Sequence, residues 1–99
     1  MPIMPDKWEI KNGCLYREYV FRDFREAFTF MTACALEAEA ANHHPDWRNV
    51  YNRLEVWLIT HEARSLTERD YKLARAFETL HERMFGGSDG DSDGQGASA

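Results

Sequence analysis

The sequence has few cysteines, few prolines and no long apolar run, and each shortage excludes a class of protein. Cys14 and Cys34 are its only cysteines, so a disulfide-stapled scaffold is not indicated and both thiols are expected to be reduced. No stretch approaches the ~20 apolar residues of a membrane span, and the first residues lack the basic and apolar regions of a signal peptide. A cytoplasmic protein without membrane contact is therefore expected.

Positive charge is also scarce. Lysine and arginine number 12 against 17 aspartate and glutamate, which gives a net charge of -5, and no basic run stands out. Because nucleic-acid binding depends on cationic side chains that neutralise phosphates, direct binding to DNA or RNA is disfavoured.

What the sequence does contain is enough apolar surface for one core. Of its 99 residues 43% are hydrophobic and 13% aromatic, and a chain this short builds a single domain. That domain is expected to span residues 1–87. Residues 88–99 consist of glycine, serine, aspartate, alanine and one glutamine, so a flexible acidic tail is expected there.

The first structured segment is expected to be a β-hairpin. Residues 8–11 alternate between apolar and polar, and residues 14–21 are rich in aromatic and β-branched side chains. Asn12 and Gly13 between them suit a two-residue turn, because both tolerate positive φ.

A helix is expected to follow from Asp23 to about Asn42. Glu26 provides the capping-box partner of Asp23, and apolar residues then recur with a 3.6-residue period. Pro45 is expected to enforce the stop, since it disfavours helical geometry at His44.

A second hairpin is expected over residues 48–60, with its turn at Asn52 and Arg53. Its second strand carries apolar residues on both faces, which is typical of a central strand. A last helix should begin at a capping box formed by Thr67 and Asp70 and close at the glycines at 86–87.

The expected order is strand, strand, helix, strand, strand, helix. Two hairpins separated by a helix predict a two-layer α+β domain, in which one four-stranded antiparallel sheet carries both helices on a single face. The other face would need cover, so a homo-oligomer is expected.

Four polar residues form the main candidate site. Glu39 and His43 are four residues apart, so they are expected on one helix face, and His44 follows directly. The fold plan brings His61 back toward the same helix end. Imidazoles with a carboxylate suit proton transfer near neutral pH, although helix-end and loop roles would also explain these residues.

Other interpretations of these and further residues are less strongly supported by the sequence. Two or three histidines with a glutamate could bind zinc, but no His-Glu-x-x-His or paired-cysteine motif is present, so no metal is expected. Asp70 is interpreted as the capping partner of Thr67. Trp47 and Trp57 could stack on a flat heterocycle, but aromatic residues in strands are more often core or interface residues.

These residues resemble the pterin-4a-carbinolamine dehydratase family. The resemblance is carried by E-x-x-x-H-H-P-D-W-x-N-V-Y-N, then T-H-E, then L-T-E-R-D, and covers about two thirds of the chain. It implies dehydration of 4a-hydroxytetrahydropterin to quinonoid dihydropterin, with the pterin as substrate and no metal or organic cofactor. Functional coupling to an aromatic amino-acid hydroxylase is also implied.

The resemblance implies a role for each site residue. His43 and His61 would transfer protons, His44 would bind and polarise the substrate, and all three count as catalytic. Asp70 would support the site. The substrate-binding positions implied are Glu39, Asn42, Pro45, Trp47, Thr60 and Glu62.

Three departures from the family pattern stand out. Asn42 replaces a common aspartate, Ser65 replaces a common glycine, and the helix that usually precedes the tryptophan is expected to be absent before Trp8. The family also contains non-catalytic dimerisation, assembly and transcriptional-coactivator modules, which is the alternative function. Homodimers and homotetramers both occur in the family.

Overall fold

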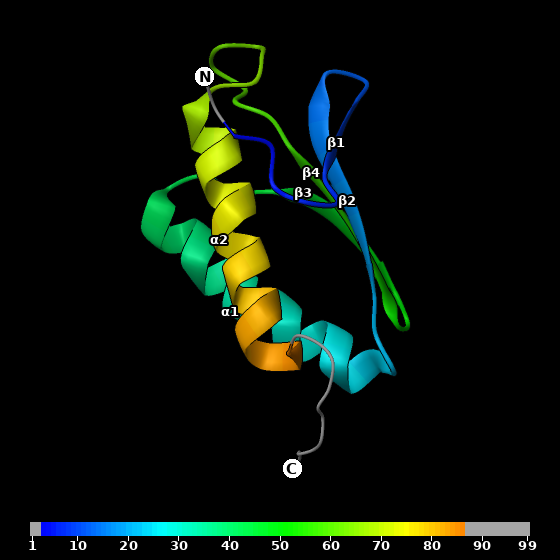
Figure 1. The fold of residues 1–99 in the computed structure, drawn as a ribbon. Coiled ribbons are helices and arrows are strands. Elements are labelled where there is room, and N and C mark those ends of the chain that lie inside the picture. Colours follow the sequence, from blue (N-terminus) through cyan, green and yellow to red (C-terminus); the bar gives the residue numbers. More distant parts are fainter. Residues whose placement is uncertain (1–2, 87–99) are drawn as a thin grey trace.

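A computed structural model of the chain describes residues 3–86 and shows a sheet layered against two helices (Figure 1). The elements are β1 (Glu9–Lys11), β2 (Cys14–Val20), α1 (Phe24–Ala41), β3 (Asp46–Val50), β4 (Arg53–Leu58) and α2 (Glu68–Phe85). This is the predicted order. The acidic tail predicted for 88–99 lies outside the described residues.

The four strands form one antiparallel sheet in the order β1-β2-β4-β3, so β4 is central, as its apolar residues on both faces predicted. Both helices cover the same face of the sheet (Figure 1). The predicted two-layer α+β fold is confirmed.

The first hairpin turn lies where the sequence predicted it, and the second is shifted by one residue. Asn12 and Gly13 have φ of 52° and 79°, so the first turn has positive φ at both positions, as predicted. The second turn is centred on Tyr51 and Asn52, one residue earlier than predicted, and Arg53 already pairs with Val50.

Two hydrogen bonds to the residue that follows β2 account for the earlier turn. The Asn52 side-chain amide donates to the carbonyl of Phe21 at 2.9 Å, and the Phe21 amide donates to the Asn52 carbonyl at 2.8 Å. Asn52 is therefore held against the end of β2, and the strand can start immediately after it.

The core lies between the sheet and the helices. Leu15, Phe30, Cys34, Leu54, Val56, Leu58, Ala74 and Phe77 are fully buried within it. Burial raises the pKa of the Cys34 thiol, so this cysteine is a packing residue, and both cysteines are free as expected.

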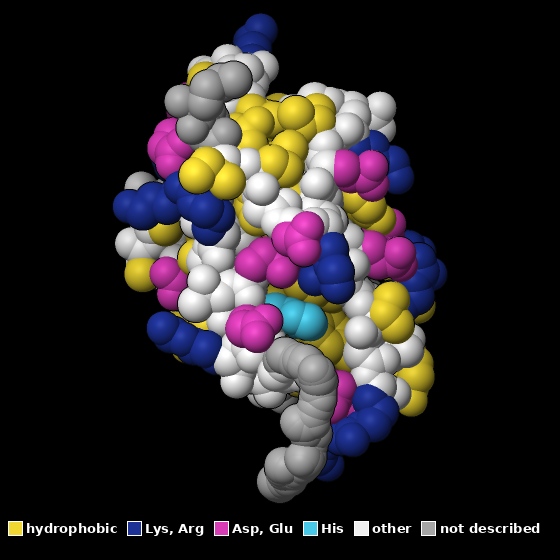
Figure 2. Space-filling model, in the orientation of Figure 1, with side chains coloured by type: hydrophobic (Ala, Val, Ile, Leu, Met, Phe, Trp, Pro, Cys, Tyr) yellow, Lys and Arg dark blue, Asp and Glu magenta, His cyan; other side chains and the backbone are white. Residues whose placement is uncertain are grey.

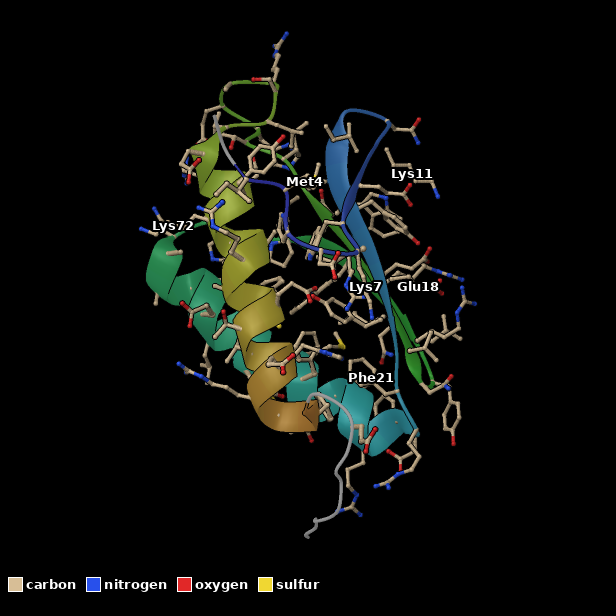
Figure 3. All side chains as sticks on the ribbon, viewed as in Figure 1. Met4, Lys7, Lys11, Glu18, Phe21 and Lys72 are labelled. Carbon is tan, nitrogen blue, oxygen red and sulfur yellow. The ribbon has the colours of Figure 1, made fainter. Side chains whose placement is uncertain are left out.

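The other face of the sheet carries several ion pairs. Glu55 accepts from the Tyr16 hydroxyl at 2.7 Å and contacts Arg48 at 3.4 Å, while Arg53 donates to Glu18 at 2.6 Å. Figure 3 shows Glu18 on the side of the sheet that faces away from the helices. Ion pairs and rings occupy much of this face, and Val20 and Val50, the last residues of β2 and β3, are 63% and 47% exposed. The homo-oligomer itself stays a prediction.

Exposed apolar side chains also lie on α1, where Phe24, Phe28 and Leu36 are 47%, 52% and 69% exposed. The segment from residue 3 to Trp8 forms no helix, which agrees with the predicted departure. Within residues 3–86, no helix has the length and apolar character needed to cross a membrane.

Candidate active site

The end of α1 determines where the adjacent histidines point. Asn42 adopts a left-handed conformation with φ of 53°, its amide donates to the Glu39 carbonyl at 3.1 Å, and the His43 amide donates to the Ala38 carbonyl at 3.0 Å. This pair of bonds is a Schellman motif. The chain therefore leaves the helix at Asn42, three residues before Pro45, so the left-handed cap rather than the proline makes the stop.

The reversal at Asn42 separates the two histidines. His43 is 6% exposed and faces the interior, whereas His44 stays at the surface. The predicted pairing of Glu39 with His43 was wrong, because His43 has left the helix. Glu39 instead contacts His44, with Oε1 2.9 Å from Nε2, and both side chains are exposed.

His43 meets a buried carboxylate from the other helix. Its Nε2 lies 2.6 Å from Oδ1 of Asp70, which is 0% exposed. The second oxygen, Oδ2, accepts from the Thr67 amide at 2.9 Å and from the Thr60 hydroxyl at 2.7 Å. The capping role predicted for Asp70 is confirmed, and the same side chain also binds the candidate catalytic imidazole.

His61 lies just past the central strand, on an exposed turn. β4 ends at Leu58, and Thr60 then bridges to Ser65, so that residues 61–64 form a closed turn. The His61 Nε2 lies 3.5 Å from Oδ2 of Asp46, the first residue of β3. This contact joins the turn to the segment that follows the two histidines.

Arg69 connects the end of α1 to the turn that contains His61, a role that was not predicted from the sequence. It donates to the Asn42 carbonyl at 2.9 Å, and another of its nitrogens lies 3.6 Å from Glu62. A hydrogen bond from the Glu62 backbone, together with the Arg69 charge, lowers the pKa of Glu62. The only sequence signal for this role was a basic side chain in the first turn of a helix that meets the α1 end.

The structure thus gathers most predicted site residues at one end of the domain. His43 forms the interior part, and His44 and His61 lie at the surface with Glu39 and Glu62. Thr60 is 4% exposed and its hydroxyl faces Asp70, away from solvent. Asn42 is exposed and Pro45 is partly buried beside the histidines.

The two tryptophans lie on opposite faces of the sheet. Trp47 pairs with Val56 and packs against the hydrophobic core, whereas Trp57 packs on Tyr16 with ring centroids 5.3 Å apart. They do not form two walls of one pocket. Within residues 3–86, no group of three or more His, Cys, Asp or Glu side chains is placed to hold a metal ion.

A cavity of about 600 Å³ lies elsewhere, between the N-terminal segment, β2 and the second half of α2. Its lining includes Lys7, Arg17, Glu78 and His81 and none of the candidate site residues. Figure 2 shows acidic and basic side chains around a hollow on this face, with an imidazole at its edge. The cavity is therefore separate from the candidate site.

The fold and site define a small α+β domain with an imidazole–carboxylate cluster at one end. The family model described as Pterin 4 alpha carbinolamine dehydratase matches residues 2–80. The chain belongs to the pterin-4a-carbinolamine dehydratase family, and the resemblance seen in the sequence is confirmed.

Individual relatives agree. A provisionally named pterin-4-alpha-carbinolamine dehydratase of Solibacter usitatus is 55% identical over 73 residues, covering 74% of this chain and 77% of the relative. Another from Christiangramia forsetii is 49% identical over 77 residues, covering 78% and 79%. A crystal structure titled transcriptional coactivator/pterin dehydratase from Brucella melitensis superposes with a TM-score of 0.73 at 42% identity, covering 76% of this chain and 82% of that one.

Proposed function

We propose that this chain dehydrates a 4a-hydroxytetrahydropterin to the quinonoid dihydropterin and water by histidine acid–base catalysis. The relatives that it matches over about three quarters of its length carry the name of this activity. One observation carries the proposal to this chain, namely the imidazole of His43 bound through one nitrogen to a buried carboxylate. Such a pairing fixes the orientation of the ring and determines which of its nitrogens carries a proton.

The reaction needs two proton transfers. One proton must reach the departing hydroxyl at C4a, and one must leave the ring, so that the carbon–oxygen bond breaks as a double bond forms in the pterin. His43 and His61 are assigned these transfers, since an imidazole can both give and take a proton near neutral pH. No metal or organic cofactor is invoked.

The surface residues are assigned to binding. His44 would bind and polarise the substrate, and Glu39, which contacts it, would hold the polar edge of the pterin. Glu62, ionised beside Arg69, would lie next to His61 in the same site. Asn42, Pro45 and Trp47 would contribute to the rim. Coupling to an aromatic amino-acid hydroxylase and assembly as a homodimer or homotetramer belong to the same proposal.

The test is the dehydration rate of a 4a-hydroxytetrahydropterin generated in situ. Wild-type protein should exceed the spontaneous rate, and His43→Ala should lower kcat by at least ~100-fold, the range expected for loss of a general acid or base. His81→Phe is the matched control, because His81 lies in the aromatic cluster around Phe30 and Phe85. A wild-type rate equal to the spontaneous one would refute the dehydratase assignment.

A second function has one specific observation in its favour. The Brucella melitensis structure is titled both transcriptional coactivator and pterin dehydratase. A non-catalytic dimerisation, assembly or coactivator role is therefore the alternative proposal. Co-purification of a stable heterologous partner that survives combined replacement of His43, His44 and His61 would favour it.

A further inference from the structure

A chain of short hydrogen bonds runs behind His43. The hydroxyls of Thr67 and Thr60 are 2.6 Å apart, Thr60 lies 2.7 Å from Oδ2 of Asp70, and Oδ1 of Asp70 lies 2.6 Å from Nε2 of His43. Thr60, Asp70 and His43 are 4%, 0% and 6% exposed. Because water has little access, these groups must satisfy one another.

The directions of these bonds follow from the chemistry of each group. The Thr67 amide can only donate, so it donates to Oδ2 of Asp70. An ionised carboxylate only accepts, so Thr60 donates its single hydroxyl proton to the same oxygen. The Thr60 oxygen then has lone pairs but no proton left for Thr67, and the Thr67 hydroxyl must donate to it.

The proton on His43 can be placed in the same way. Oδ1 of Asp70 can only accept, so Nε2 of His43 carries the hydrogen. Within residues 3–86 the structure records no hydrogen bond to the other ring nitrogen, Nδ1. The nitrogen without a protein partner is the one that can exchange a proton with a substrate.

We infer that Thr60 and Thr67 are positioning residues whose hydroxyls orient Asp70, which in turn holds His43 as the Nε2–H tautomer and makes Nδ1 the proton-transferring nitrogen. Thr60 is then no substrate-binding residue, in contrast to the role that the family resemblance implied. Its single hydroxyl proton is used inside the protein, since it is donated to Asp70, and the oxygen also accepts from Thr67. The kinetic part of this inference rests on the proposed dehydratase function, whereas the tautomer does not.

The first test measures the tautomer directly by nitrogen NMR of the His43 ring at pH 7.5, with signals assigned by their loss in His43→Gln. Wild-type protein should show a protonated Nε2 and an unprotonated Nδ1. Thr60→Val, which keeps the shape of the side chain but removes the hydroxyl, should give a mixture of tautomers, and Thr60→Ser should restore one. A wild-type ring protonated at Nδ1 would overturn the inference without any variant.

The second test separates positioning from substrate binding. Thr60→Val should lower kcat by about 10-fold or more, the usual cost of losing a residue that orients a functional histidine, and should leave KM within about twofold. Thr60→Ser should recover most of kcat. A rise in KM with unchanged kcat would return Thr60 to the substrate-binding set and overturn the inference.

The two tests fail independently. If wild-type protein has no dehydratase activity, the proposed function fails, and the NMR measurement still decides whether the hydroxyls fix the tautomer. If activity is present but Thr60→Val keeps the wild-type ring pattern and kcat, the dehydratase assignment stands and the positioning role is wrong. Should Thr60→Val not fold, the wild-type spectrum and Thr67→Val, which removes the hydroxyl that donates to Thr60 and should give a mixture of tautomers, still test the positioning role.

Discussion

Two carboxylates of α2 face the interior of the protein, and their donors differ in kind. Asp70, in the first turn, contacts the imidazole of His43 and accepts from the Thr60 hydroxyl and the Thr67 amide. None of these three groups carries a permanent charge. Glu78, two turns later, accepts from Trp8, Arg17 and Tyr19 at 2.8, 2.8 and 2.6 Å, all on the same oxygen, Oε2.

This difference indicates a role in the chemistry for Asp70 and a structural role for Glu78. An indole, a guanidinium and a phenol keep their protons near neutral pH, whereas an imidazole can release its proton. Burial would raise the pKa of Glu78, but hydrogen bonds from Arg17 and Tyr19 hold it below its ordinary value. Glu78 is therefore an anion that holds the N-terminal segment, the sheet and α2 together, whereas Asp70 binds an imidazole, a group that can exchange protons.

The largest expected effect comes from replacing Asp70 by asparagine. The amide could donate to Nε2 of His43 and favour the wrong tautomer, so kcat should fall by on the order of 100-fold. The rate with a 4a-hydroxytetrahydropterin measures this directly. Asp23→Asn is the matched control, because Asp23 caps α1 through its side chain and asparagine caps equally well. Equal losses in both variants would show that the effect is not specific to the site.

Glu78→Gln should lower stability and leave kcat nearly unchanged, the reverse of what is expected for Asp70→Asn. Loss of the charge leaves the buried guanidinium of Arg17 without an anion, so the free energy of unfolding should fall by about 2–3 kcal/mol, while kcat of the folded protein stays within twofold. Urea denaturation gives the first quantity. Glu82→Gln, an exposed change on the same helix, should cost less than about 0.5 kcal/mol. A large loss of kcat in Glu78→Gln would remove the distinction between the two carboxylates.

The sequence predicted what is local and missed what depends on a few backbone angles. The Asn12-Gly13 turn, the helix N-caps at Asp23 and Thr67 and the central strand follow from neighbouring residues, and all appear in the structure. The partner of His43 could not be predicted in the same way, since Asp70 lies 27 residues away. The left-handed conformation of Asn42 also explains why Glu39 contacts His44 and not His43, the predicted partner.

The helix pattern nevertheless contained a signal for the buried polar groups. Asp70, Ala74, Phe77 and His81 are spaced three or four residues apart, so a regular helix must place Asp70 and His81 on its apolar face. A carboxylate on such a face needs donors from elsewhere in the fold. Which donors it finds depends on tertiary packing, and this is why the capping role of Asp70 was predictable and its contact with His43 was not.

His81 gives a smaller effect that depends on pH. Burial, and then the charge of Arg17, lower the pKa of His81, with Glu78 and Glu82 opposing the shift. The unfolded chain therefore binds a proton more readily than the folded one, and stability should fall as pH drops through and below 6.5. His81→Phe should remove this contribution and gain less than about 1 kcal/mol at pH 5.5. Denaturation of both proteins at pH 8 is the internal control, since the pH-dependent difference should vanish there.

The smallest effect on chemistry is expected at Asn42, although the family resemblance singled out this residue. Its contributions to the site are a left-handed backbone and a carbonyl that accepts from Arg69, and any side chain that tolerates this conformation retains both. Asn42→Asp should change kcat by less than about twofold and the free energy of unfolding by less than about 0.5 kcal/mol. Asn42→Ala, which tolerates positive φ poorly, should cost about 1 kcal/mol by denaturation. If Asn42→Asp instead alters kcat or KM severalfold, the Asn42 side chain acts on the substrate itself, and the site extends further along the surface than the Asp70–His43 pair indicates.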